Sequence, residues 1–153
     1  MSAEKAVAGY VDLLLHEWQM ERQFPRIRRC VRKILNELSG ESQLALWREP
    51  RLEVKVIPGE RGSARDVWAY FPISPRRLIA RGLNLRPDTR VLLLLTAPGW
   101  MRGPMADLEG NLRHHLGHTL LYLRNPRGRN ECSDADREWR NSIGIDRRGR
   151  VQA

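Results

Sequence analysis

Cysteine and long apolar runs are both scarce in this sequence. Cys30 and Cys132 are the only cysteines among the 153 residues, too few for the disulfide framework of a small secreted domain. The longest apolar run, over residues 91–95, has the length of a strand and falls far short of the roughly 20 residues of a membrane-spanning helix. Residues 1–5 lack the basic segment and following apolar block of a secretory signal peptide. These absences predict a cytoplasmic protein with no membrane segment.

Lysine is nearly missing as well, although the chain is strongly basic. Only Lys5, Lys33 and Lys55 of the 27 basic residues are lysines, the rest are arginines, and the net charge is +9. The excess of arginine fits codon usage in a GC-rich genome better than a phosphate-binding role, because arginine replaces lysine at no cost to the fold. The net charge is better evidence for a polyanionic partner than the arginine content, because it creates a field that attracts polyanions.

The length and the hydrophobic pattern predict one mixed domain. A chain of 153 residues buries roughly 68–70% of its unfolded surface without help from a disulfide or a metal. Apolar periodicity predicts helices over 3–23, 26–39, 43–47, 75–81, 105–124 and 133–142, and strands over 52–56, 67–73 and 91–96. This order predicts an α+β fold with N-terminal helices, a small three-stranded sheet and two C-terminal helices. We expect a single domain over 1–144 and a basic, flexible tail over 145–153.

Three of the four histidines lie close together, in the run His-His-Leu-Gly-His over residues 114–118. On a helix, His114 and His118 are about one turn apart, with Cβ atoms roughly 5–6 Å from each other and within reach of one metal ion. At about 100° per residue they point away from the leucine stripe at positions 112, 116 and 120, which is free to pack inward. Neutral imidazole at this spacing is a good zinc ligand, although a bare pair is also typical of a solvated helix face.

The run over 114–118, followed by Thr-Leu-Leu-Tyr-Leu, resembles the active-site helix of zincin metallopeptidases, which is written HExxH and often reads HELGH. The expected order upstream, with an N-terminal helix, a small sheet, an apolar strand and a loop, also resembles the minimal zincin core. The nearest resemblance is to the small ImmA/IrrE-like metallopeptidases, over about residues 91–139. It implies a minimal zincin-like fold in which His114 and His118 bind Zn²⁺, and an extended peptide substrate laid along a strand edge.

The same resemblance implies a carboxylate as the third zinc ligand. The family carries such a residue on a later helix, followed by Ala and then Asp or Asn, and Asp134-Ala135-Asp136 is similar to that stretch. Asp134 stands at the ligand position, with Glu131 and Asp136 as alternatives, since acidic residues also gather at helix N-termini for electrostatic reasons. Cys132 could be a soft metal ligand, but we favour the interpretation that it is a bystander near the helix cap. Ser133 is the expected cap, with Asp136 as its capping-box partner.

One residue departs from the zincin pattern, because His115 stands where HExxH has its glutamate. That glutamate is the general base of the family and passes a proton from water to the leaving amine. A histidine can do base chemistry near neutral pH, so His115 is the candidate catalytic residue. Its protonated form is disfavoured beside a dication, which weakens it as a proton carrier. The resemblance thus implies a zincin-like metal-binding domain, which is either an active hydrolase or a degenerate metallopeptidase.

A second hypothesis belongs to another class: a basic, non-enzymatic accessory protein of bacterial, phage or plasmid origin that binds nucleic acid. Basic stretches over 26–33, 76–90, 124–129 and 147–150 could follow a phosphate backbone. They come without a helix-turn-helix, zinc-finger or RNA-recognition motif, and such stretches are usually solvated surface. Stoichiometric zinc would favour the first hypothesis, and a steep salt dependence of nucleic-acid binding would favour the second.

Overall fold

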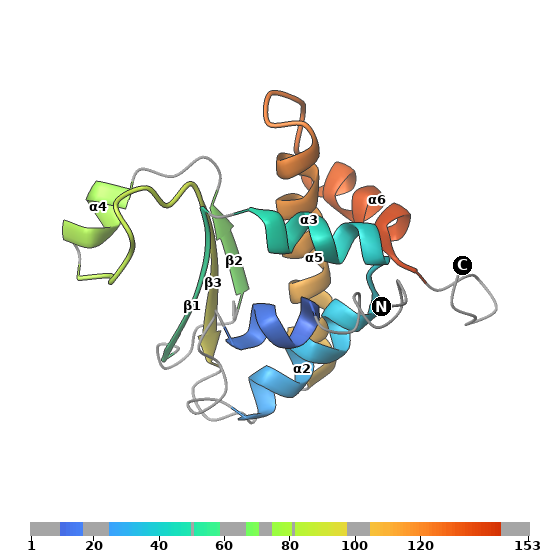
Figure 1. The fold of residues 1–153 in the computed structure, drawn as a ribbon, viewed down its shortest axis with the longest axis horizontal. Helices are drawn as coiled ribbons and strands as arrows, with labels where there is room; N and C mark the ends of the chain where they lie inside the picture. Colours follow the sequence, from blue (N-terminus) through green and yellow to red (C-terminus); the bar gives the residue numbers. More distant parts are fainter. Residues whose placement is uncertain are drawn as a thin grey trace.

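The structure is a computed structural model that describes residues 10–16, 25–49, 51–58, 67–70, 75–80, 82–97 and 105–144 (Figure 1). Residues 10–16 are helical. The elements that follow are α2 (Pro25–Glu37), α3 (Gly40–Arg48), β1 (Leu52–Pro58), β2 (Val67–Tyr70), α4 (Pro75–Ala80), β3 (Val91–Ala97), α5 (Met105–Arg124) and α6 (Cys132–Ser142). This helix-dominated arrangement with a small sheet agrees with the α+β class expected from the sequence.

The sheet is built on β3, which lies between the other two strands in the order β1-β3-β2. β1 runs parallel to β3 and places Val54 opposite Leu93, whereas β2 runs antiparallel and places Ala69 opposite the same residue. A parallel pair needs a crossover connection, and the chain between β1 and β3 supplies one that includes β2 and α4. The apolar sequence of β3 suits its central place, because Val91 and Leu92 point to opposite faces and both are buried.

Helices cover one face of the sheet, and α4 with the following segment lies beyond the other (Figure 1). Among the sheet residues whose side chains are described, Leu52, Val54, Val91 and Leu93 join the main core. Because neighbouring strand residues alternate between faces, Glu53 points to the α4 side. Its buried carboxylate accepts hydrogen bonds from the backbone N–H and the Nε of Arg86, at 3.0 and 2.6 Å. This pair ties the segment after α4 to β1.

α5 is the central helix and packs against the sheet, α2, α3 and α6. Its leucine stripe, Leu112, Leu116 and Leu120, is buried in the core, as the spacing predicts. Arg113 on the flank donates to both carboxylate oxygens of Glu37 in α2, at 2.9 and 2.8 Å. The inward face of α5 is thus fixed by packing, and the opposite face is left for other chemistry.

α6 packs closely against the second half of α5. The approach depends on Gly117, because a Cβ atom there would lie 2.2 Å from the backbone oxygen of Ala135. Arg124 of α5 donates to both carboxylate oxygens of the buried Glu138 of α6, at 3.0 and 2.8 Å. At the far end of α6, the Ser39 N–H donates to the Ser142 carbonyl at 2.7 Å. These contacts hold the N-terminus of α6 beside the histidines of α5.

α6 begins earlier than the sequence predicts. Its N-cap is Glu131, and the capping-box partner is Asp134, in place of the expected Ser133 and Asp136. The earlier start places Cys132 in the first turn of the helix. Three predicted features lie outside the described residues. They are the two ends of the helix predicted over 3–23, the part of the second strand after residue 70, and the tail over 145–153. Of the helices that the structure describes, none is long and apolar enough to cross a membrane.

Candidate metal centre

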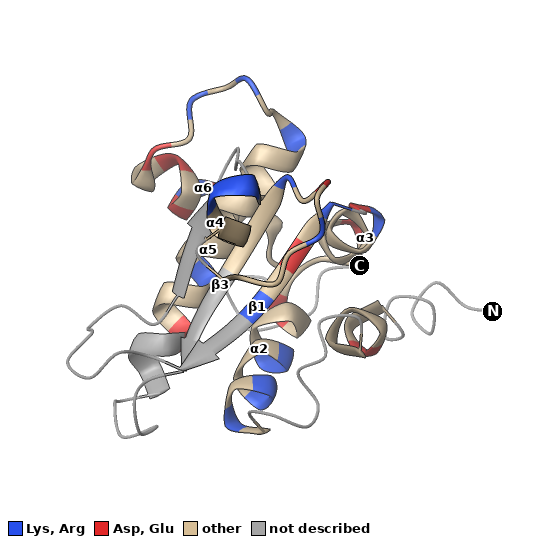
Figure 2. Cartoon of the chain, turned by 90° about the vertical axis from the view of Figure 1, so that its left-hand side faces the viewer, with Lys and Arg blue, Asp and Glu red and all other residues tan. Residues whose placement is uncertain are grey.

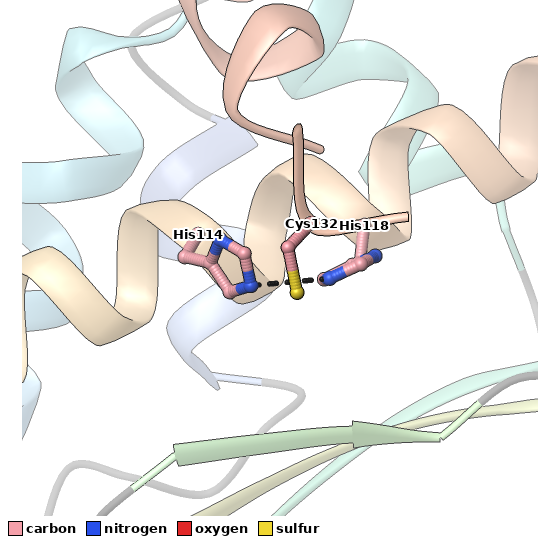
Figure 3. Close-up of side chains that lie close together, drawn as sticks. All are labelled: His114, His118 and Cys132. Carbon is pink, nitrogen blue, oxygen red and sulfur yellow. Dashed lines mark hydrogen bonds between the residues drawn. The ribbon is translucent and has the colours of Figure 1, made fainter. Parts of the chain in front are cut away.

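Two histidines of α5 point toward each other on the face opposite the leucine stripe. His114 and His118 are half-buried, and their ring centroids are 4.7 Å apart. Figure 3 shows the two imidazoles converging on a point that the Cys132 side chain of α6 also approaches. The spacing of about one helical turn therefore places both rings on one side of the helix, as the sequence predicts.

Asp136 of α6 fixes the His114 ring. Its Oδ1 lies 2.8 Å from His114 Nδ1. A carboxylate oxygen only accepts hydrogen bonds, so the proton in this contact belongs to the imidazole Nδ1. In the neutral ring the lone pair of His114 is then on Nε2.

Asn130 fixes the His118 ring in the same tautomer. The Asn130 Nδ2 donates to the backbone oxygen of His118 at 3.0 Å, which sets the orientation of the amide. Its Oδ1 therefore faces His118 Nδ1, 2.7 Å away, and accepts a hydrogen bond from it. The neutral ring of His118 also carries its lone pair on Nε2.

The two Nε2 atoms lie 3.1 Å apart. In neutral rings with protonated Nδ1 atoms both are acceptors, so this contact is repulsive unless a cation lies between them. A metal ion or an additional proton supplies that cation. Tetrahedral zinc with nitrogen ligands at about 2.0–2.1 Å holds them roughly 3.3–3.4 Å from each other, close to the spacing seen here. The Nδ1–H bonds to Asp136 and Asn130 are of the kind that orients metal-binding histidines.

Cys132 brings a third donor to the same place. The ligand atoms of His114, His118 and Cys132 all lie within 4.8 Å of one another (Figure 3). Cys132 is exposed, so the group is accessible from solvent. Nitrogen and sulfur donors suit zinc and other soft or borderline ions. The donor set therefore fits the Zn²⁺ expected from the sequence.

Asp134, the third ligand expected from the sequence, has other partners. Its two oxygens accept hydrogen bonds from Nε and Nη2 of Arg129, at 2.8 and 2.9 Å, and Oδ2 also accepts from the Glu131 N–H at 3.1 Å. The Arg129 guanidinium, and after it the Glu131 N–H, lowers the pKa of the Asp134 carboxyl below its ordinary value. The structure thus uses Asp134 as a cap and ion-pair partner, and it brings Cys132 to the imidazoles instead. Of the two alternatives, Glu131 is the N-cap and Asp136 holds His114.

His115, the candidate catalytic residue, lies beside the imidazole pair. Its ring centroid is 5.3 Å from that of His114 and 6.1 Å from that of His118. Its ring is half-buried, and its backbone oxygen accepts a hydrogen bond from the Thr119 hydroxyl at 2.9 Å. A third imidazole is therefore close to the three donor atoms without being one of them.

No known protein family, curated protein or solved structure matches this chain. Support for a function therefore comes from the chemistry of the side chains themselves. The sequence does not predict two features of the centre: the hydrogen bonds of Asn130 to His118 and the hydrogen bond between Asp136 and the His114 ring. Both side chains reach the histidines only because α5 and α6 form a tight hairpin, and a single sequence carries no signal for that contact. The acidic residues at the start of α6 direct attention to this helix, but they do not indicate which side chains meet the histidines.

Proposed function

We propose that this chain is a metal-binding protein on a zincin-like scaffold, with Zn²⁺ held by His114 and His118 of α5. The observation that carries the proposal is the 3.1 Å contact between two Nε2 atoms whose rings both donate through Nδ1. Such a pair is stable around a cation and repulsive without one. The two outer partners, Asp136 and Asn130, hold the lone pairs in place before an ion arrives, so less ordering is needed on binding.

The zincin-like scaffold is supported by the order and packing of the elements. The histidine helix α5 follows an apolar strand and packs along β2, which is an edge of the described sheet. The following helix, α6, also contributes side chains to the centre, as in the family that the sequence resembles. An extended peptide that paired with the β2 edge would lie beside α5, so a peptide or protein segment is the partner we propose.

These residues fit a degenerate metallopeptidase, a protein that keeps the metal centre of a peptidase and has little or none of its hydrolytic activity. A bound divalent ion supplies Lewis-acid chemistry at such a centre. His115 lies beside the centre and is able to move a proton there, since an imidazole can accept a proton on one ring nitrogen and donate from the other. It cannot supply the negative charge that the zincin glutamate brings beside a dication. We therefore propose that metal binding is retained and that hydrolysis is weak or lost.

Nucleic-acid binding by the arginines has less support. Figure 2 shows basic residues spread over several elements with acidic residues among them. Several form ion pairs with carboxylates: Arg32 with Asp12 at 2.6 Å, and Lys33 with Glu109 and Arg124 with Glu138 both at 2.8 Å. These pairs reduce the positive charge that α2 and the end of α5 present to a polyanion.

Metal analysis of the purified full chain tests the proposal. We expect about one zinc per chain, and added zinc should raise the melting temperature, because a ligand that binds only the folded state stabilises it. His114→Ala and His118→Ala should lose both the zinc and the thermal shift. His16→Ala is the matched control, since His16 is an exposed histidine on the helix of residues 10–16 and should change neither.

The proposal fails if the wild-type chain holds no transition metal and zinc leaves its melting temperature unchanged. The two imidazoles would then share a proton in place of an ion. Equal loss of zinc in the His16→Ala control would also contradict it, because the binding would then be nonspecific.

A further inference from the structure

We infer that Cys132 is the third ligand of this centre, which makes it a thiolate site that selects thiophilic ions such as Zn²⁺ and Co²⁺ over Mg²⁺ and Mn²⁺. One coordination position is left open for a donor atom from outside the chain. The inference rests on the proposed metal-binding function and goes beyond it in naming the ligand and the class of ion.

The carboxylates near the start of α6 are all occupied by other partners. Asp134 faces Arg129 through both oxygens, and Asp136 is bound to the Nδ1 of His114, on the side of the ring away from the Nε2 pair. Glu131 closes the capping box of α6. Among the described residues of this helix, the sulfur of Cys132 is therefore the donor that lies with the two imidazoles.

The position of the sulfur is set by contacts on both sides of it. Asn130 precedes Cys132 by two residues and is hydrogen-bonded to both the ring and the backbone of His118. After it, Ala135 packs against Gly117, one residue before His118. The chain on either side of Cys132 is thus anchored to the same turn of α5. A sulfur held in this way needs only a small side-chain movement to complete a site whose donors already lie within 4.8 Å.

The donor set decides which ions the centre takes. A thiolate and two imidazoles favour soft or borderline ions, whereas Mg²⁺ and Mn²⁺ prefer carboxylate, carbonyl and water oxygens. Structural zinc sites are closed by four protein ligands, and sites with three leave a position open. The described residues supply three donors here, and Cys132 is exposed, so the open position faces solvent.

Cobalt(II) added to the metal-free full chain is the probe that tests the ligand directly. We expect d–d absorption of bound cobalt together with a thiolate-to-cobalt charge-transfer band in the near ultraviolet. Cys132→Ser should abolish that band and weaken zinc binding by more than about 100-fold, beyond the roughly 10–100-fold cost of losing an outer-shell partner. Cys132→Asp should also abolish the band. This variant should still bind an ion, and its affinity for Zn²⁺ should exceed its affinity for Mn²⁺ by a smaller factor than in the wild type.

Two matched controls accompany these variants. Cys30→Ala removes the other cysteine, which lies on α2 and is buried. Burial raises the pKa of its thiol to about 11. Asp134→Asn removes the carboxylate that the sequence favours as a ligand. Both should keep the charge-transfer band, and Asp134→Asn should change zinc affinity by less than about threefold, well below the cost of losing an outer-shell partner.

The outcomes separate this inference from the proposed function. Cobalt bound with d–d absorption and no charge-transfer band overturns the thiolate ligand and leaves the histidine centre standing. A band that survives Cys132→Ser also overturns it. Failure of the wild-type chain to bind either cobalt or zinc overturns both proposals. Because Cys132 is exposed, its replacement by serine should leave the melting temperature of the metal-free chain unchanged, which keeps a folding defect from imitating ligand loss.

Discussion

In the proposed metal centre, the chemistry that we expect depends on the residue at position 115. A carboxylate beside a dication keeps its charge and can still accept a proton from water, whereas an imidazolium beside the same ion is repelled and gives up its proton early. A side chain at position 115 lies close enough to accept or donate a proton at the centre, since the ring of His115 is 5.3 Å from that of His114. In the proposed metal centre, we expect the nature of this one side chain, more than its position, to limit hydrolysis.

The variant His115→Glu should therefore gain activity. It places a carboxylate beside the ion and leaves His114, His118 and Cys132 in place, so zinc content should be unchanged. Hydrolysis of an unstructured peptide should rise above that of the wild type and disappear when a chelator removes the metal. The measurement is peptide cleavage followed by mass spectrometry, with zinc content determined on the same samples.

The reverse pattern would show that His115 already serves as the base. The wild type would then be active and His115→Ala would be the damaging change. Metal-loaded wild type and His115→Glu that are both inert would instead indicate a metal domain without catalytic function, and would contradict the degenerate-peptidase proposal.

At the scale of elements, the centre depends on how closely α6 approaches α5. Gly117 permits that approach, because a Cβ atom there would collide with the Ala135 backbone at 2.2 Å. Backbone cannot move aside as a flexible side chain can, so Gly117→Ala should destabilise the fold by about 1–3 kcal/mol, the usual cost of overpacking. It should also weaken zinc binding, because Cys132 and Asp136 would shift away from the histidines.

Gly110 provides the matched control for Gly117 on the same helix. A Cβ atom at Gly110 would meet nothing within 4 Å. Gly110→Ala should therefore be neutral or stabilise the protein by up to about 1 kcal/mol through helix propensity. Urea unfolding of the two variants measures the difference, and equal stability of both would contradict the importance of the close helix contact.

The pattern of apolar residues predicts a helix or strand well where its period matches the face that the folded chain buries. The apolar period gives α5 its observed bounds, Met105–Arg124, and the run from Val91 gives the central strand. The pairing of His114 and His118 follows from the same period. The start of α6 and the identity of the residue that it places beside the two imidazoles do not follow from this period, because they depend on which side chain caps the helix. Glu131 takes that role and places Cys132, not Asp134, beside α5.

On the scale of the whole molecule, the net charge is +9 after every Asp and Glu is counted, so ion pairs within the chain leave it unchanged. Arg127 and Arg140 are exposed and form no ion pair in the described part of the chain, whereas Arg124 and Arg129 are each bound to a carboxylate. The field of the molecule therefore attracts polyanions, and basic residues lie on several elements with acidic residues among them (Figure 2). This distribution favours weak, sequence-independent contact with phosphates over a defined nucleic-acid interface.

Binding to duplex DNA should accordingly be weak and strongly dependent on salt. For about six phosphate contacts, affinity should fall on the order of 10³-fold between about 50 and 200 mM salt, because each contact releases a counterion. Replacing Arg127 and Arg140 together with alanine should lower the salt slope by roughly two if both contact phosphates, since each phosphate contact contributes about one unit. The matched pair is Arg124→Ala with Arg129→Ala, whose positive charges are already countered by Glu138 and Asp134 and should contribute less. Fluorescence anisotropy across a salt series measures both slopes. Binding that is insensitive to salt, or absent even at low salt, would identify the arginines as solvated surface and would leave the metal centre as the function of the chain.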